Sequence, residues 1–157
     1  MNVLGIDPGK SGGLAVVQSK TNQIPKIIKA IKMPTLIVNT KKIIDISKLK
    51  SQLENIPISV AIIEKAHAMP RQGVTSSFQF GRSYGAVEGL CQIVTGRIDY
   101  VSPSVWKKAF GLSSSKQASL DLAKLKFGND KIWDIKSNDG IAEAALISLF
   151  WIERFGR

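Results

Sequence analysis

Apolar residues in this chain gather in five short runs, separated by polar or glycine-containing stretches. Short runs rich in β-branched residues and bounded by turn residues predict β-strands. The first three runs follow one another through short connections, which favours an antiparallel meander. The fourth is apolar at almost every position, as expected of a central strand covered on both faces. The predicted strands are 3–7, 13–18, 26–33, 59–64 and 99–103.

The segments between these runs carry helical spacing. In 45–55, Ile46, Leu49 and Leu53 recur at intervals of three and four residues, and Pro57 ends the element. The resulting order is that of an α/β protein with an antiparallel start, and its sheet needs helices on both faces. The other predicted helices are 78–94, a short helix from Pro103 through Trp106, 116–127, and 137–155 with Ser137 or Asn138 as its N-cap.

The composition narrows this picture to one folded domain over residues 1–157. Apolar residues make up 44% of the chain and charged residues 22%, which is usual for globular proteins. No apolar stretch approaches the roughly 20 residues that span a bilayer. The N-terminus also lacks the basic region and cleavage site of a secretory signal. We therefore expect a cytoplasmic protein without a membrane partner.

The chain is strongly basic, with a formal net charge of +10 and a pI near 9.9. This balance favours a polyanionic partner, although a high positive charge can also serve solubility alone. His67 and Cys91 are the only histidine and the only cysteine. A zinc site built from these residue types is therefore excluded, and any metal site has to use oxygen ligands.

Four carboxylates stand where they could meet. Asp7 and Glu64 each end an apolar strand, and the ends of neighbouring strands lie about 5 Å apart. Asp139 and Glu143 are four residues apart near the start of the last predicted helix, so they share one face. Each has a simpler explanation as well: Asp7 precedes a Pro-Gly turn, Asp139 suits the helix dipole, and Glu64 and Glu143 could be solvated charges.

If the four carboxylates lie close together, their mutual repulsion points to a bound cation more strongly than any one of them does. Two carboxylates about 5 Å apart repel by about 3 kcal/mol at an effective dielectric constant of about 20. Divalent cations remove this penalty, and carboxylate oxygens suit Mg²⁺ or Mn²⁺. Two such ions about 4 Å apart can activate a water and stabilise the leaving oxygen in phosphodiester hydrolysis.

Four ordered motifs are spread over nearly the whole chain: LGIDPGKSGGLAVV, AIIEKAHAMPRQGVTSSFQFGRSYGAVEGL, VSPSVWKKAFGL and DGIAEAALIS. Together they resemble the RuvC Holliday junction resolvases in the form carried by bacteriophages and some bacteria. The resemblance implies a three-layer ribonuclease H-like fold with a five-stranded mixed sheet and helices on both faces. It also implies a homodimer and Mg²⁺-dependent cutting of four-way DNA junctions, with three-way junctions and forks as further branched substrates.

Carried over by position, the resemblance makes all four carboxylates catalytic metal ligands for two Mg²⁺ ions, with Mn²⁺ as a substitute. Asp7 takes the first-strand position, Glu64 the fourth-strand position, and Asp139 and Glu143 the two positions on the final helix. Cellular resolvases usually carry two aspartates three residues apart on that helix, whereas here the spacing is four and the second residue is Glu. The resemblance also implies that Lys116 stabilises the charge of the transition state.

The expected DNA contacts surround this set. His67 occupies the position where cellular members place an aromatic wedge, and Phe78 is either a substitute wedge or a core residue. The loop over 69–77 is expected to contact phosphates, and Trp106 is expected to pack rather than stack on bases. The predicted DNA-binding residues are Lys10, His67, Arg71, Gln72, Arg82, Lys107, Lys108 and Lys116.

Three other functions stay open at this point. A branched-DNA-binding protein without turnover would use the same basic surface but show no Mg²⁺-dependent cleavage. A ribonuclease H-like nuclease would prefer an RNA–DNA hybrid to a junction. An actin-like or sugar-kinase ATPase could use GIDPGKSGG as a phosphate loop, but such enzymes enclose the nucleotide between two domains of this kind.

Overall fold

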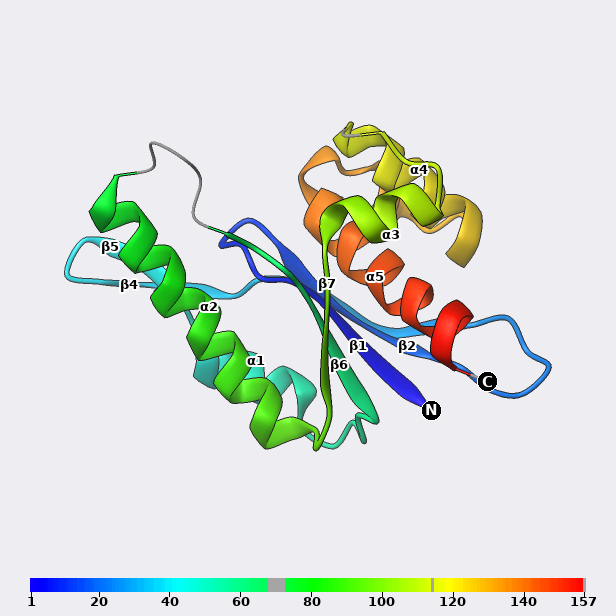
Figure 1. The fold of residues 1–157 in the computed structure, drawn as a ribbon, viewed down its shortest axis with the longest axis horizontal. Coiled ribbons are helices and arrows are strands. Elements are labelled where there is room, and N and C mark those ends of the chain that lie inside the picture. The colour runs from blue at the N-terminus through cyan, green and yellow to red at the C-terminus, as the bar shows by residue number, and fades with distance from the viewer. Residues whose placement is uncertain (68–72, 114, 157) are drawn as a thin grey trace.

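The computed structural model describes residues 1–67, 73–113 and 115–156. Its centre is a five-stranded mixed sheet with the strand order β3-β2-β1-β6-β7 (Figure 1). β1 pairs antiparallel with β2 and parallel with β6, and β6 pairs parallel with β7. All five predicted strands and their antiparallel start are thus confirmed. The strands are β1 (Asn2–Asp7), β2 (Gly13–Gln18), β3 (Lys26–Lys32), β6 (Val60–Glu64) and β7 (Ile98–Val101).

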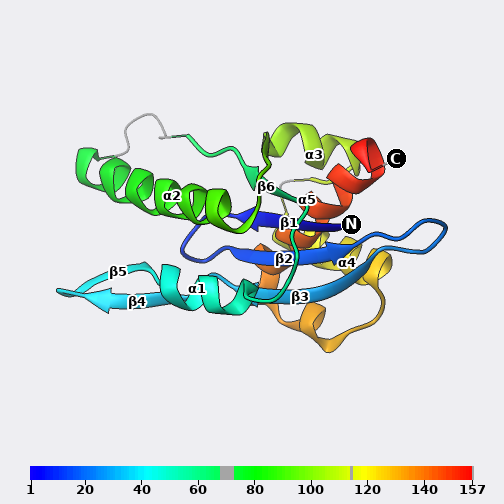
Figure 2. The ribbon, with the colours of Figure 1, turned by 90° about the horizontal axis from the view of Figure 1, so that it is seen from below.

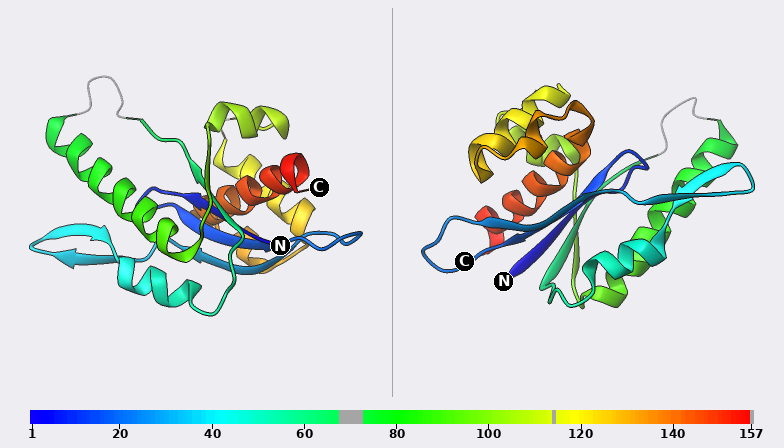
Figure 3. Two further views of the ribbon diagram at one scale, coloured as in Figure 1. Left: turned by 60° about the horizontal axis from the view of Figure 1, so that its bottom comes forward. Right: turned by 180° about the vertical axis from the view of Figure 1, so that it is seen from behind.

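Helices cover both faces of the sheet, which confirms the predicted three-layer α/β architecture. Figure 3 shows α1 and α2 on one side, and α3, α4 and α5 on the other. No helix in the described part of the chain is long and apolar enough to span a membrane. The helices are α1 (Ile46–Leu53), α2 (Val74–Val94), α3 (Pro103–Ala109), α4 (Lys116–Phe127) and α5 (Asp139–Phe155), with short 3-10 turns at Lys131–Asp134 and Lys136–Asn138.

Alternation along the strands divides the core in two. Val3 of β1 and Val60 and Ile62 of β6 belong to the core beneath α5, whereas Leu4 and Ile6 belong to the core beneath α1 and α2. Successive side chains of a strand point to opposite faces. The continuous apolar character of β1 and β6 therefore reflects burial on both sides.

The last helix lies directly on the sheet. Almost every residue of α5 from Gly140 to Ile152 is buried, because α4 covers the side that faces away from β1 and β2. A Cβ at Gly5 would overlap the carbonyl oxygen of Ala144 and lie 2.5 Å from Ser148 Oγ. This Oγ hydrogen-bonds the carbonyl oxygens of Val3 and Ala15 at 3.3 and 3.2 Å. The helix backbone thus rests on the strands at a glycine.

The structure adds one element that the hydrophobic pattern does not predict. β4 (Thr35–Val38) and β5 (Lys41–Ile44) form an antiparallel hairpin that is a separate two-stranded sheet. Asn39 and Thr40 at its tip have φ values of +46° and +65°, typical of the two-residue turns that match the twist of hairpin strands. Figure 2 shows this hairpin extending beyond the central sheet on the side of α1 and α2.

Three local predictions need correction. α2 begins at Val74, so the end of the predicted loop is helical; residues 68–72 of that loop lie outside the described residues. Phe78 is 63% exposed, so its prediction as a core residue is wrong: it lies on the outer side of α2. Asn138 occupies the N-cap position of α5, but its side chain donates a hydrogen bond to the carbonyl oxygen of Ile132 (2.8 Å) instead of capping.

Candidate active site at the ends of strands β1 and β6

Asp7 and Glu64 stand side by side at the same edge of the central sheet. The parallel register pairs Ile6 with Ile63, so the two carboxylates are the next residues of neighbouring strands. By alternation, both side chains fall on the face that α5 covers. The two strands are neighbours in the sheet, which is the condition for the two acids to lie close together, and both acids point towards the same helix.

Glycines bring the first turn of α5 against the turn that follows Asp7. A Cβ on Gly140 would lie 2.6 Å from the Cα of Gly12, and one on Gly13 would lie 2.9 Å from the Cα of Ile141. A Cβ on Gly12 would in turn lie 2.7 Å from Cγ of Asp7. Because backbone meets backbone here, Asp139 at the start of α5 is held at the same end of the sheet as Asp7.

The two acids on α5 each pair with a lysine from another helix. Lys107 Nζ of α3 lies 2.7 Å from Glu143 Oε1, and both side chains are mostly buried. Ser119 of α4 donates a further hydrogen bond to the same oxygen at 3.2 Å. Lys116 Nζ lies 2.7 Å from Asp139 Oδ2, and its pKa is raised by this hydrogen bond and by the charge of Asp139. α3 and α4 thus carry the two cations to this edge.

The other two carboxylates have raised pKa values. Burial raises the pKa of Asp7 to about 6, against a hydrogen bond from the N–H of Gly9, and the charges of Glu143 and Asp139 add to the rise. Burial likewise raises the pKa of Glu64 to about 7, with repulsion from Asp7 and Glu143 added. Trp106 Nε1 donates a 2.7 Å hydrogen bond to Glu64 Oε1 and limits this rise. Asp7 is therefore close enough to Glu64, Asp139 and Glu143 for their charges to interact.

All four acids of this edge offer carboxylate oxygens as ligands. Asp139 and Glu143 pair with lysines, whereas Asp7 and Glu64 form no ion pair within the described residues, so two of the four carboxylates lack a cationic partner. Oxygen ligands with excess negative charge suit Mg²⁺ or Mn²⁺. In the described ranges, however, no three His, Cys, Asp or Glu side chains are grouped closely enough to hold one ion. Metal binding by these four residues stays a prediction.

Removing the charge of Glu64 should stabilise the protein at high pH. Between pH 4.5 and about 7 the folded protein keeps a proton that the unfolded chain has released, so wild-type stability falls as pH rises through this window. In a chelator at pH 8, Glu64→Gln should therefore raise the free energy of unfolding by about 3 kcal/mol, and the gain should vanish below pH 4.5. Gln keeps the acceptor for Trp106.

Urea unfolding of both proteins from pH 4 to 9 measures this difference. The matched control is Glu54→Gln, which changes a carboxylate at the exposed end of α1 and should show no such pH-dependent gain. A Glu64→Gln protein that is less stable than wild type at pH 8 would contradict the electrostatic interpretation.

The predicted DNA-binding residues lie on several elements around this edge. Lys10 lies in the turn after Asp7, Lys108 is exposed on α3 next to Lys107, and His67 is exposed just after β6. Arg82 is exposed on α2, where it faces the β4–β5 hairpin. Arg71 and Gln72 lie outside the described residues.

Three residues of this edge were not predicted to have a part in it. Trp106 is fully buried, as predicted, but its indole N–H also orients Glu64. Ser119 is a small residue in an amphipathic helix, and nothing in its local pattern signals contact with Glu143. Lys32 pairs with Gly13 across β2 and β3, and its Nζ hydrogen-bonds Ser137 Oγ at 2.8 Å. Strand register could have placed Lys32 here, because it ends the strand beside Gly13.

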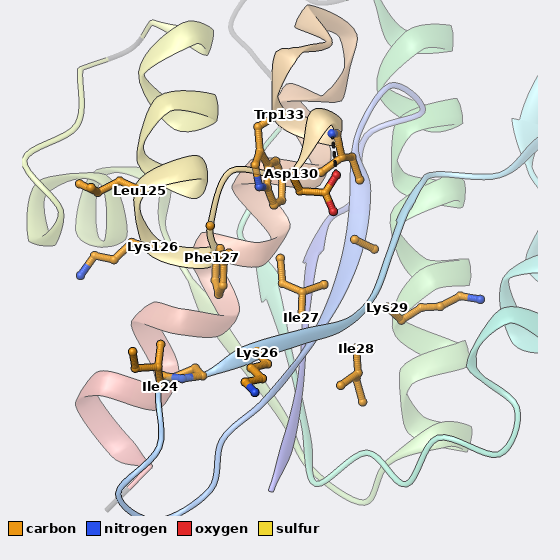
Figure 4. Close-up of a pocket in the computed structure, with 14 residues that line it drawn as sticks. Ile24, Lys26, Ile27, Ile28, Lys29, Leu125, Lys126, Phe127, Asp130 and Trp133 are labelled. Atoms are coloured by element: carbon orange, nitrogen blue, oxygen red, sulfur yellow. Dashed lines mark hydrogen bonds between the residues drawn. The ribbon is translucent and has the colours of Figure 1, made fainter.

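A groove of about 770 Å³ lies at the end of the sheet opposite to the carboxylates of the candidate active site (Figure 4). It is formed by the first half of β3 with Ile24, and by the end of α4 with Phe127 and Trp133. This half of β3 pairs with the end of β2, opposite to the end that carries Gly13. The groove is therefore separate from the four carboxylates of the candidate active site.

The structure of this chain is similar to solved structures of known proteins. No protein-family model and no curated protein matches the sequence. Thermus thermophilus RuvC in complex with a Holliday junction substrate is similar in structure, with a TM-score of 0.69 and 16% identity over 99% of this chain and 97% of that one. The Fowlpox virus resolvase, in complex with Holliday junction DNA, is similar with a TM-score of 0.64 and 17% sequence identity, over 100% of both chains. The yeast mitochondrial Holliday junction resolvase Ydc2 is similar with a TM-score of 0.56 and 15% sequence identity, over 96% of this chain and 77% of that one. The chain thus shares the fold of these Holliday junction resolvases, which is the fold that its motifs predict.

Proposed function

We propose that this protein is a metal-dependent endonuclease that resolves four-way DNA junctions. The observation that carries the proposal is that Asp7, Glu64, Asp139 and Glu143 lie at the same edge of the sheet, with Lys107 and Lys116 paired to two of them. The net charge of +10 adds attraction for a polyanion. Proteins of the same fold that bind Holliday junctions support this choice of substrate.

The four carboxylates would hold the metal, with two Mg²⁺ ions as the proposed cofactor and Mn²⁺ as a substitute. When bound, divalent ions supply an activated water and stabilise the leaving oxygen of a phosphodiester. The chain itself positions these groups: β1 and β6 fix Asp7 and Glu64, Trp106 orients Glu64, and the first turns of α5 carry the other two.

Lys116 and Lys107 have different surroundings and therefore different proposed parts. The side chain of Lys116 is 78% exposed while its Nζ touches Asp139, so it can reach a phosphate beside the carboxylates and stabilise charge that develops there. Lys107 is only 23% exposed and holds Glu143, and its Nζ lies 5.2 Å from the ring centre of Trp106. Lys107 therefore positions Glu143 and offers a second, more enclosed cation.

A junction-binding protein without turnover is the second candidate. One observation favours it: Glu143 Oε1 is engaged by both Lys107 and Ser119, which leaves this acid less available as a ligand. The basic surface would then matter without the chemistry. Mg²⁺-dependent cleavage separates the two candidates directly.

We propose that the active form is a homodimer. A four-way junction is resolved by two opposed cuts, so two identical sites related by twofold symmetry suit it. Gly81, Gly85 and Gly89 repeat every four residues along α2, and a Cβ on any of them would meet no atom within 4 Å. This open face would allow a second copy to approach closely. Light scattering should give about twice the chain mass of 17.1 kDa.

Cleavage assays on a panel of labelled DNAs test the proposal. We expect paired cuts in mobile and fixed four-way junctions with Mg²⁺, weaker cutting of three-way junctions and forks, and no cutting of linear duplex or in a chelator. Preferential cleavage of an RNA–DNA hybrid would instead identify a ribonuclease. Junction binding without cleavage in either Mg²⁺ or Mn²⁺ would favour the binding protein.

As an enzyme acting on intracellular DNA, the protein would work in the cytoplasm of a bacterial cell.

A further inference from the structure

A basic groove runs between the β4–β5 hairpin and α2, starting next to the candidate active site. Its first hollow, of about 490 Å³, is bounded by Pro8 and Lys10 of the turn after Asp7 and by Lys41 and Lys42 of β5. A second hollow, of about 450 Å³, adjoins it, shares Lys41 and Gln79 with it and adds Arg82. We call these two hollows the hairpin groove.

The lining of the hairpin groove is suited to phosphates. Among the described residues that line the two hollows, four are cationic and none is acidic. Neutral donors from α2 complete the wall. These are Thr75, Ser76, Gln79 and Ser83. Lys, Arg, Ser, Thr and Gln side chains make the contacts that hold a nucleic-acid backbone without reading its sequence.

The hairpin that forms one wall has a defined shape. Its four backbone pairs and its tight turn at Asn39 and Thr40 hold Lys41 and Lys42 on a regular strand, and both lysines are exposed. The strand leads into Ile44, which is buried beneath α2. Lys41 and Lys42 thus lie on a strand whose last residue is buried in the core, in the hairpin that extends beyond the central sheet (Figure 2).

We propose that the hairpin groove binds the phosphate backbone of one DNA arm that leaves the active site. This inference rests on the proposed function, because Lys10 connects the groove to Asp7. Lys41 and Lys42 would each neutralise a phosphate, remote from the reacting one. Their contacts would act on affinity for any branched DNA, regardless of its sequence.

The first test measures affinity for a fixed four-way junction by fluorescence anisotropy from 50 to 400 mM KCl, on the Asp7→Asn background. Replacing Lys41 and Lys42 by Ala should weaken binding about 10- to 60-fold near 0.1 M salt, and should lower the slope of log affinity against log salt by about 1.8. The control replaces Lys20 and Lys26 by Ala. These exposed lysines lie at the opposite end of the sheet, and their loss changes the net charge equally.

These binding measurements test the proposed function and the role of the hairpin groove separately. If the parent protein fails to bind junctions, the proposed function is wrong. If the parent binds but the Lys41/Lys42 double variant matches the control variant in affinity and salt slope, the hairpin groove does not hold DNA, and a protein partner becomes the better occupant. Circular dichroism checks that the hairpin variants keep the fold.

A second measurement locates the DNA without removing any cation. Val38→Cys places a thiol at the hairpin tip, while the native Cys91 is only 1% exposed and should resist labelling. An iron–EDTA group on that thiol should cleave the backbone of a bound junction within one arm. Cleavage no greater than that of an identically labelled Ser19→Cys protein, at the far end of the sheet, would overturn the proposal.

Discussion

Asp7→Asn should abolish junction cleavage and leave junction binding intact. Asn keeps the size of the side chain and the oxygen that accepts the N–H of Gly9, so the turn at the end of β1 should persist. What is lost is the charge at the centre of the set, which interacts with Glu143, Asp139 and Lys107. One unit charge interacts with another about 4 Å away by about 4 kcal/mol at a dielectric constant of about 20. Losing this much stabilisation of the reacting complex slows cleavage at least about a thousandfold.

Single-turnover cleavage with Mg²⁺ and binding in a chelator measure the two effects separately. Asp130→Asn is the matched control: Asp130 is exposed, and it also accepts a backbone N–H, from Ile132. This control should cleave at the wild-type rate. An Asp7→Asn protein that cleaves within tenfold of wild type would remove Asp7 from the chemistry.

Gly5→Ala should destabilise the whole domain although it adds only a methyl group. That methyl would overlap the carbonyl oxygen of Ala144 and lie 2.5 Å from Ser148 Oγ, both on α5. Since α5 is buried and held by α4, it cannot move away without opening the core. We expect the free energy of unfolding to fall by about 3 kcal/mol, and the midpoint of thermal unfolding to fall by about 10 °C.

Thermal unfolding followed by circular dichroism measures this effect. Gly96→Ala makes the same chemical change after α2, where a Cβ would meet no atom within 4 Å, and should leave the midpoint nearly unchanged. A loss below 1 kcal/mol in Gly5→Ala would show that α5 is not in tight contact with β1.

The placement of the acids could be predicted because it depends on local rules. An apolar run that ends in a carboxylate predicts a buried strand with its last side chain at the sheet edge, and this holds for both Asp7 and Glu64. Helical spacing likewise puts Asp139 and Glu143 on one face. The fold followed from the same patterns, because strands covered on both faces have a strong apolar signature.

The partners of these acids could not be predicted in the same way. Lys107 meets Glu143, and Trp106 meets Glu64, only because α3 packs beside α5 and next to the end of β6, contacts between residues far apart in the sequence. The β4–β5 hairpin escaped prediction for another reason. Its strands are four residues long, and one apolar face is exposed at Ile37, so the hydrophobic pattern is weak.

The separateness of the β4–β5 hairpin has a consequence for how this protein could change over time. Within the described part of the chain its strands pair only with each other, so insertions, deletions or charge changes at its tip leave the hydrogen bonds of the five-stranded sheet unchanged. Asp7, Glu64 and α5 depend on that sheet and on close backbone contacts, and they tolerate far less. Related chains could therefore acquire new preferences among branched DNAs by remodelling the hairpin, while the hydrolytic chemistry stays the same.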